Sequence, residues 1–302
     1  MNRLIICCLV LFFPAVSAAA VPAATVPAAE NSSDFFRVVQ KEDKRAPHSM
    51  ETAIVRFTDG DKHIKVDLVA AVHIGDKEYY EELNERFKDY DSVLYELVAE
   101  QGTTINKKAV EDKKKKSVLS GFQTGMGEAL DLDFQLEHVD YTAKNFVHAD
   151  LSPDEFAKRF ADRSDLLQMI YRVLVLGVSK SADGGDADIK TQGRMLGTFF
   201  SSNPTLSLKR LIAKEMVAQM DDSMWIIGGD GSAIITDRNE AALKVLRKQL
   251  KKGDKTIAIF YGGAHLPEFA KSLKKDFQMT PVQTTWVTAW DLTSDRSARK
   301  TD

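Results

Sequence analysis

Cysteine is scarce in this 302-residue chain, and its position matters more than its number. The two cysteines, Cys7 and Cys8, lie inside an apolar N-terminal segment typical of a secretion signal. If that segment is removed, the mature protein holds no thiol, which excludes disulfide bonds and covalent thiol catalysis. The chain also lacks a large excess of one charge, since 41 Lys and Arg face 44 Asp and Glu. This balance argues against a general nucleic-acid binder.

Several well-known catalytic motifs are also missing. There is no H-E-x-x-H, so a helix-borne zinc protease site is excluded, and no G-x-S-x-G nucleophile turn. The glycine-rich stretch 228–231 lacks the Lys-Ser/Thr pair of a phosphate-binding loop and is better interpreted as a turn. Any chemistry must therefore come from side chains that the fold brings together.

The N-terminal 34 residues are expected to lie outside the folded domain. Residues 1–18 combine a basic start, an apolar core too short for a stable membrane span, and small residues before a cleavage point near Ala19. Residues 19–34 form a Pro/Ala-rich linker, and 293–302 a polar tail. We therefore expect an exported protein, periplasmic or secreted, with no stable membrane span after cleavage and one domain over residues 35–292.

A predicted strand–helix–strand unit lies at the centre of the sequence. Residues 64–72 alternate apolar and polar side chains and lose the polar ones as the strand enters the interior, ending at His73. A helix follows, with Asp76 placed to cap it. Residues 92–98 predict a buried second strand that carries one carboxylate, Glu96. In open α/β sheets ligands sit beyond the carboxyl ends of strands, where both His73 and Glu96 fall.

The rest of the chain supplies more of the sheet and its helices. Residues 52–57 and a turn at 58–61 predict an antiparallel hairpin at the sheet edge. Residues 101–225 are interpreted as a helical insertion or cap, with one strand at 132–139. Further strands are predicted at 255–260 and 284–292, and helices from 153, at 166–178, 190–200, 206–222 and 237–251, and from 267. The expected fold class is α/β, with a mixed central sheet, flanking helices and a helical insertion.

Two strand ends repeat one pattern. Residues 70–75 (AAVHIG) and 262–267 (GGAHLP) each follow a buried strand with small residues, a histidine and the start of a helix. Small residues allow the backbone to approach a bound ion or substrate closely. Arg238 and Asn239 open another helix between them, and Glu96 supplies a carboxylate.

This ordered set resembles the TraB/PrgY/GumN/Tiki family over about residues 50–290. The shared order is a histidine after a strand, a glutamate, a mid-chain helical region, an Arg-Asn pair and a Gly-x-x-His. The resemblance implies an EreA/ChaN-like fold and a metal-dependent hydrolase, since some members cleave peptides. Ala70 stands where the family usually has glycine. Members also act in pheromone inactivation and regulation, so the resemblance does not fix a substrate.

The resemblance also implies roles for individual residues. His73, Glu96 and His265 would bind a divalent metal ion, and Glu96 and Arg238 would be catalytic. Two imidazoles and a carboxylate with open positions for water suit Zn²⁺, Mn²⁺, Co²⁺ or Fe²⁺, of which Mn²⁺, Co²⁺ and Zn²⁺ are the expected candidates.

Each of these residues also has a structural interpretation. A single histidine at a strand end is more often a hydrogen-bonded structural residue than a ligand. Glu96 is harder to explain this way, because a carboxylate in an apolar strand is costly unless it is paired, protonated or bound to metal. Arg238 could be only its ion-pair partner. His138 and His148 are interpreted as structural, and Asp140 as a residue that could orient a ligand.

Three functional hypotheses follow. The first is an exported metal-dependent hydrolase acting on a peptide or protein substrate, in which Glu96 or a histidine handles the proton of a metal-activated water and Arg238 stabilises the oxyanion. The second is a protein that holds a metal or haem-like ligand without turnover, which a Soret band would reveal for haem. The third is a protein whose helical block binds a partner while the site is silent.

Overall fold

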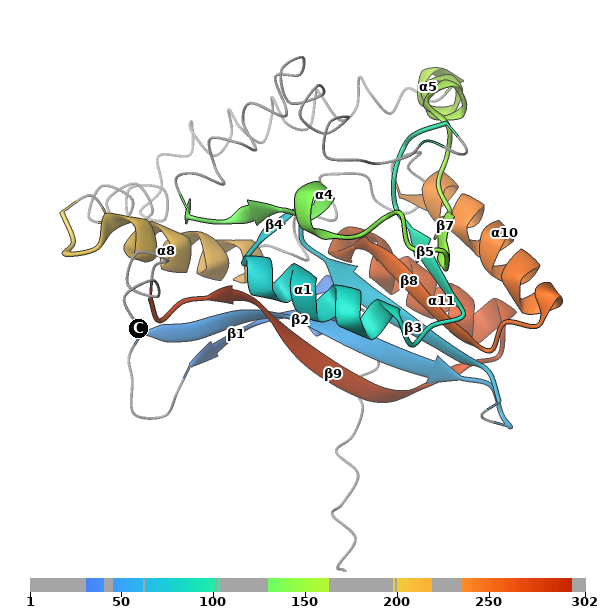
Figure 1. The fold of residues 1–302 in the computed structure, drawn as a ribbon, viewed down its shortest axis with the longest axis horizontal. Coiled ribbons are helices and arrows are strands. Elements are labelled where there is room, and N and C mark those ends of the chain that lie inside the picture. Colours follow the sequence, from blue (N-terminus) through green and yellow to red (C-terminus); the bar gives the residue numbers. More distant parts are fainter. Residues whose placement is uncertain are drawn as a thin grey trace, which may run out of the picture.

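A seven-stranded mixed sheet forms the centre of the protein (Figure 1). The computed structural model describes residues 31–40, 46–61, 63–100, 103, 130–162, 198, 200–218 and 235–294. The strand order is β1-β2-β3-β8-β5-β7, and β9 pairs with the other side of β2. The strands are β1 (Phe36–Gln40), β2 (Pro47–Thr58), β3 (Lys65–Ala71), β5 (Ser92–Tyr95), β7 (Phe146–His148), β8 (Thr256–Gly262) and β9 (Thr280–Asp291).

The sheet has a parallel half and an antiparallel half. Strands β3, β8, β5 and β7 run parallel, whereas β1, β2, β3 and β9 pair antiparallel. The parallel strands are short, almost uninterrupted apolar runs because helices cover the sheet on both faces. Pairing from Lys65 with Thr256 to Ala71 with Gly262 makes the carboxyl ends of β3 and β8 finish side by side.

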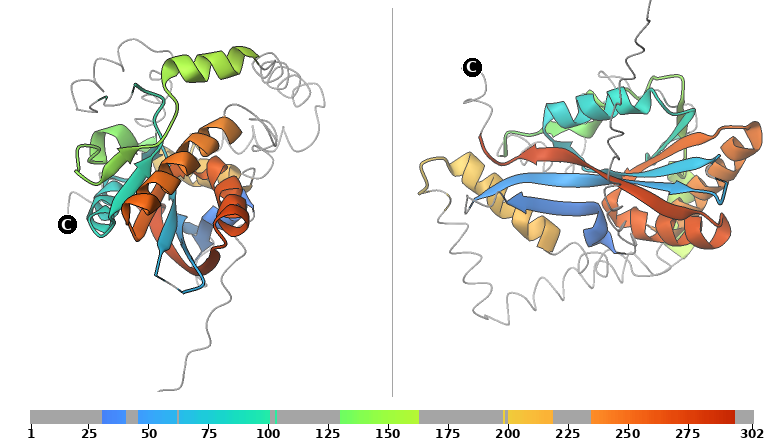
Figure 2. Two further views of the ribbon diagram at one scale, coloured as in Figure 1. Left: turned by 90° about the vertical axis from the view of Figure 1, so that its right-hand side faces the viewer. Right: turned by 90° about the horizontal axis from the view of Figure 1, so that it is seen from below.

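Helices cover the two faces of the sheet (Figure 2). Helix α1 (Lys77–Phe87) lies on one face, and α10 (Thr236–Lys252) and α11 (Leu266–Asp276) lie on the other. Helix α8 (Pro204–Ala218) lies beside β1. Each helix buries one stripe of residues, such as Leu83 and Phe87 in α1. The smaller elements are η1 (Ser32–Phe35), β4 (Ile74–Gly75), β6 (Asp133–Phe134), α4 (Gln135–His138), α5 (Pro153–Asp162) and η2 (Gly263–His265).

The predicted mixed α/β sheet with flanking helices is confirmed, but its strand neighbours differ from the expectation. Strand β8 lies between β3 and β5, so the connection through α1 crosses one intervening strand. The hairpin of β2 and β3 is confirmed. Its predicted position at the sheet edge is wrong, because β9 pairs with the outer side of β2 over residues 49–58.

The interpretation of residues 101–225 as an insertion needs correction. Strand β7 pairs with β5, so part of this segment completes the central sheet. The predicted strand at 132–139 is wrong: β6 has two residues, pairs only with β4 and leads directly into α4. The predicted helix start at 153 is confirmed by α5, and Ser152 before it shares reciprocal hydrogen bonds with Glu155. The helix predicted from 206 begins two residues earlier, at Pro204 in α8.

Other predictions fall outside the described residues. These are the signal peptide, most of the linker, the helix at 166–178, most of the helix at 190–200, and most of the polar tail. The capping prediction for Asp76 is half right. Asp76 takes the N-cap position of α1 without a capping hydrogen bond, and its carboxylate instead binds Lys209 and the Asp291 N–H. Within the described ranges, no helix is both long and apolar enough to cross a membrane.

Candidate active site

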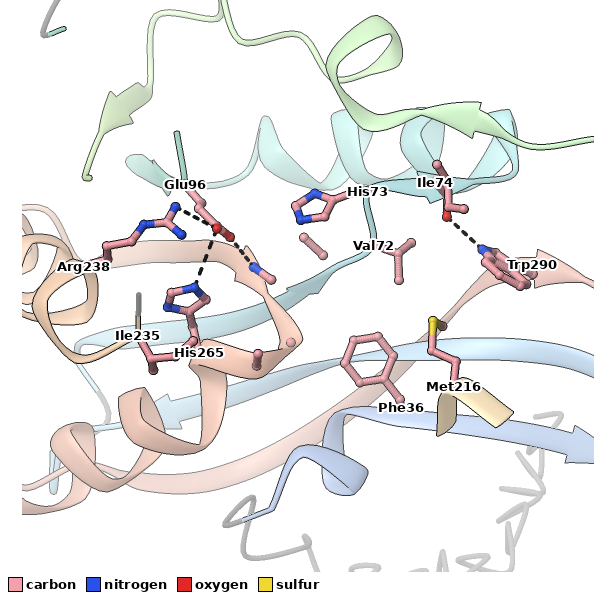
Figure 3. Close-up of a pocket in the computed structure, with 14 residues that line it drawn as sticks. Phe36, Val72, His73, Ile74, Glu96, Met216, Ile235, Arg238, His265 and Trp290 are labelled. Atoms are coloured by element: carbon pink, nitrogen blue, oxygen red, sulfur yellow. Dashed lines mark hydrogen bonds and ion pairs between the residues drawn. The ribbon is translucent and has the colours of Figure 1, made fainter. Parts of the chain in front are cut away.

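The candidate site lies where three parallel strands end. His73 follows β3, Glu96 follows β5 and His265 follows β8, and β8 is the neighbour of both other strands. After β3 the chain turns into α1 on one face of the sheet, and after β8 it turns into α11 on the other (Figure 2). A sheet opens a crevice at such a reversal, and all three side chains line one pocket there (Figure 3).

Glu96 is bound through both carboxylate oxygens. Its Oε1 forms an ion pair with Arg238 Nη2 at 2.8 Å and lies 3.6 Å from His265 Nε2. Its Oε2 accepts the Gly262 backbone N–H at 2.7 Å. Burial alone would raise the pKa of Glu96. The positive charges of Arg238 and of protonated His265, together with the Gly262 N–H, outweigh burial and lower this pKa to about 2. Glu96 is therefore a carboxylate at any physiological pH.

Arg238, at the start of α10, joins Glu96 to a second carboxylate. Its Nε and Nη2 donate to the two oxygens of Asp150 at 2.9 and 2.6 Å. The Asp150 side chain is fully buried. Arg238 and His265 line the same pocket. Two of its three nitrogens are already bonded to carboxylates, so the guanidinium mainly holds Glu96 in place.

Asp150 was not recognised from the sequence. It lies two residues after β7, a strand of three residues whose pattern is too short to be seen as periodic. The signal that could have found it is an acid directly after an apolar Phe-Val-His-Ala run, the same arrangement as Glu96 in its strand.

His265 is held in one tautomer by Asn239. Its Nδ1 lies 2.7 Å from Asn239 Oδ1. The Asn239 amide nitrogen donates to the His265 carbonyl and to Glu268, so its oxygen must face the ring. Nδ1 therefore carries the proton and Nε2 the lone pair. Burial lowers the pKa of His265 from 6.5 to about 4, against the opposing effect of Glu96, and keeps the ring neutral.

His73 has the same arrangement with a different amide. Its Nδ1 lies 3.2 Å from Gln135 Oε1, and the Gln135 amide nitrogen donates to the Tyr141 hydroxyl at 2.7 Å. The amide oxygen thus faces His73, and Nδ1–H is the donor. In contrast to His265, His73 is exposed. Neither Gln135 nor Asn239 was predicted to orient a histidine.

Two glycines at the end of β8 permit this packing. The small residues were expected to let the backbone approach a bound ion or substrate, and the groups that approach these two glycines are protein side chains. A Cβ at Gly262 would lie 3.2 Å from Glu96 Oε2, the oxygen that its own N–H binds. A Cβ at Gly263 would lie 1.9 Å from Phe36 Cε2, so any other residue type would force the Phe36 ring to shift.

The remaining candidates lie apart from this pocket. His138 is 3.3 Å from Asp133 and stacks on Tyr80, and His148 Nε2 lies 2.6 Å from the Leu97 carbonyl. Their structural interpretation fits these contacts. The suggestion that Asp140 orients a ligand is wrong, because it is exposed and binds the backbone and hydroxyl of Thr142 two residues away.

The charge and the acceptor atoms of the site suit a bound cation, although the side chains as placed do not form a coordination shell. Glu96, Asp150 and Arg238 formally sum to one negative charge, and the lone pair of neutral His265 faces a carboxylate oxygen at 3.6 Å with no proton between them. A cation between these two acceptors would relieve their repulsion. As placed, no three His, Cys, Asp or Glu side chains of the described ranges form a metal-coordinating group. His73 is the exposed member of the set.

The pocket has a volume of about 390 Å³ and two unlike ends (Figure 3). Arg238, Glu96 and His265 gather at one end, and His73 lies between them and the apolar side chains (Figure 3). The other end is lined by Phe36, Val72, Ile74, Met216 and Trp290.

No protein-family model, no curated protein and no solved structure matches this chain. The likeness to the TraB/PrgY/GumN/Tiki family therefore rests on the residues named above. The activity that it implies enters as a proposal.

Proposed function

We propose that this protein is an exported metal-dependent hydrolase that acts on peptide bonds, with His73, Glu96 and His265 as metal ligands. The observation that carries the proposal is the matched state of the two histidines. Each gives its Nδ1–H to a side-chain amide oxygen and keeps Nε2 as an acceptor in a shared pocket. Histidines that bind metals in proteins almost always donate their other N–H in this way.

The charge of the site favours a divalent ion. Glu96 and Asp150 outnumber Arg238 by one formal charge, and nitrogen and oxygen donors suit Mn²⁺, Co²⁺ or Zn²⁺. A bound ion of this kind would act as a Lewis acid and supply an activated water.

The residues of the chain would divide the remaining work. Glu96 is a weak base because its pKa is about 2, so it suits holding charge better than accepting a proton. Arg238 keeps Glu96 in place by linking it to buried Asp150. His73, the exposed member of the three, would hold the ion from the end of β3.

The test is a cleavage screen with a defined metal supply. Protein stripped with chelator would be reloaded separately with Mn²⁺, Co²⁺ or Zn²⁺ and incubated with a peptide library, and products would be read by mass spectrometry. We expect metal-dependent cleavage in the wild type and none in His265→Ala. His63→Ala, an exposed histidine before β3, is the control and should cleave as the wild type does. Metal binding without cleavage under all three ions would favour the non-enzymatic alternative.

A further inference from the structure

We infer that the apolar end of the pocket is a subsite for one uncharged apolar side chain of the substrate, next to the bond to be hydrolysed. This inference rests on the proposed function and specifies its substrate class. At about 390 Å³ the pocket is near the small end of ligand sites, which fits a short peptide segment.

The subsite wall comes from four separate segments of the chain. Phe36 belongs to β1, Ile74 to β4, Met216 to α8 and Trp290 to β9. In Figure 3 these side chains lie on the side of the pocket opposite Glu96, Arg238 and His265. A substrate that reaches the polar end with its backbone would therefore place an adjacent side chain against this wall.

Among the described residues that line it, the wall offers no free polar side-chain group to a ligand. The single polar atom of Trp290, its indole Nε1–H, already donates to the Ile74 carbonyl at 2.8 Å. The Phe36 ring is packed against Gly263. Met216 is half-buried and unbranched, so it can adapt to apolar groups of different shape.

Charge selects against acidic and basic side chains. Arg238, the cation at the polar end, is already paired with Glu96 and Asp150, and the three formally carry a net negative charge. A substrate carboxylate would meet repulsion there in the metal-free protein, and in either form it would find no counter-ion among the described residues of the apolar wall. A substrate ammonium would lose its water without gaining a partner at that wall, which is costly.

The position of Met216 is fixed by a buried ion pair. Lys209 lies two helical turns before Met216 on α8 and donates to Asp76 Oδ1 at 2.9 Å. The other Asp76 oxygen accepts the Asp291 N–H at 2.5 Å, next to Trp290. One carboxylate thus ties the α8 wall to the β9 wall, three residues after His73.

The experiment uses acetylated, amidated pentapeptides Ala-Ala-X-Ala-Ala with X as Leu, Phe, Asp or Lys. Binding to metal-loaded and to metal-free full-length protein is measured by calorimetry, and kcat/KM is measured where cleavage occurs. We expect Leu and Phe peptides to bind about tenfold more tightly than Asp and Lys peptides in both forms, the effect of burying one apolar side chain.

Substitutions at Met216 identify the subsite. Met216→Lys should remove the preference for Leu over Asp, and Met216→Leu should keep it. Val282→Lys adds the same charge at an exposed position of β9 outside the pocket and should change nothing. If Met216→Lys fails to fold, Met216→Gln replaces it, with a smaller loss in the same direction.

The possible outcomes separate the two proposals. Preferential binding of Leu and Phe peptides without cleavage under any metal would retain the subsite and contradict the hydrolase. Cleavage with equal kcat/KM for all four peptides would retain the hydrolase and contradict the subsite. A preference that survives Met216→Lys would also contradict the subsite as placed here.

Discussion

Among single residues, Arg238 has the contacts that define its role most sharply. Its guanidinium binds both oxygens of Asp150 and one oxygen of Glu96, and its side chain is 10% exposed. From the sequence, Arg238 was expected to serve as a donor to the reacting group. The contacts place its main effect in holding the Glu96 carboxylate, so its replacement should affect stability as well as activity.

We predict that Arg238→Lys lowers the free energy of unfolding by about 1–3 kcal/mol, because lysine keeps the charge but cannot bind two carboxylates with one planar fork. Urea unfolding followed by circular dichroism measures the change. Arg56→Lys is the matched control, since Arg56, whose side chain is 35% exposed, makes the same two-bond pair with Asp67 outside the pocket. Arg56→Lys should lower the free energy of unfolding by less than Arg238→Lys does, and it should leave the hydrolase activity unchanged. A stable but inactive Arg238→Lys would restore the role of direct donor.

The neutral state of His265 predicts a pH dependence of stability. In the folded, metal-free protein its pKa is about 4, whereas an unfolded histidine takes up a proton near pH 6.5. The unfolded state therefore binds more protons between these values, and stability falls by about 3 kcal/mol as the pH drops from 6.5 to 4. Unfolding curves of chelator-treated wild type and His265→Gln should converge over this window. Parallel curves would show that His265 titrates alike in both states.

Gly263 offers a further residue-level prediction. A Cβ there would overlap the Phe36 ring at 1.9 Å, so Gly263→Ala should destabilise the protein by about 1–3 kcal/mol through overpacking. Thermal unfolding measures the loss. Adding Phe36→Leu should recover part of it by removing the ring. If Gly263→Ala has the wild-type melting temperature, the contact between these residues is looser than described.

At the scale of elements, length decided what the sequence could predict. Helices α10 and α11 and strands β3 and β8 carry apolar patterns long enough to be recognised, and with them His73, Arg238 and His265 were placed correctly. The elements β6, α4 and β7 have two, four and three residues, which is too short for a periodic signal. Gln135, which orients His73, lies in α4, and it was missed. Asp150, which pairs with Arg238, lies two residues after β7 and was missed for the same reason.

The junction of α8, α1 and β9 also depends on one buried pair. Asp76→Asn would leave the Lys209 ammonium, with a side chain 3% exposed, without its carboxylate. We expect a loss of about 3–5 kcal/mol, the usual cost of breaking a buried ion pair from one side. The double variant Asp76→Asn with Lys209→Met should be more stable than Asp76→Asn alone. Equal stability of the single and double variants in urea unfolding would contradict a role for the pair.

At the scale of the whole molecule, the fold explains how distant histidines meet. His73 and His265 lie in the first and last thirds of the chain, yet β3 and β8 are direct neighbours and end in register. The sequence pattern indicated which residues end buried strands. It could not indicate that β8 inserts between β3 and β5, because strand order depends on long-range pairing that leaves no local pattern.

The most direct test of the central claim is metal stoichiometry. Chelator-treated protein would be titrated with Co²⁺ and followed by visible absorption and elemental analysis, for the wild type and for His73→Ala, Glu96→Gln and His265→Ala. We predict one ion per wild-type chain and a large loss of affinity in each variant, with His63→Ala unchanged. A wild type that binds neither Co²⁺, Mn²⁺ nor Zn²⁺, or that binds an ion which none of the three substitutions disturbs, would contradict the account.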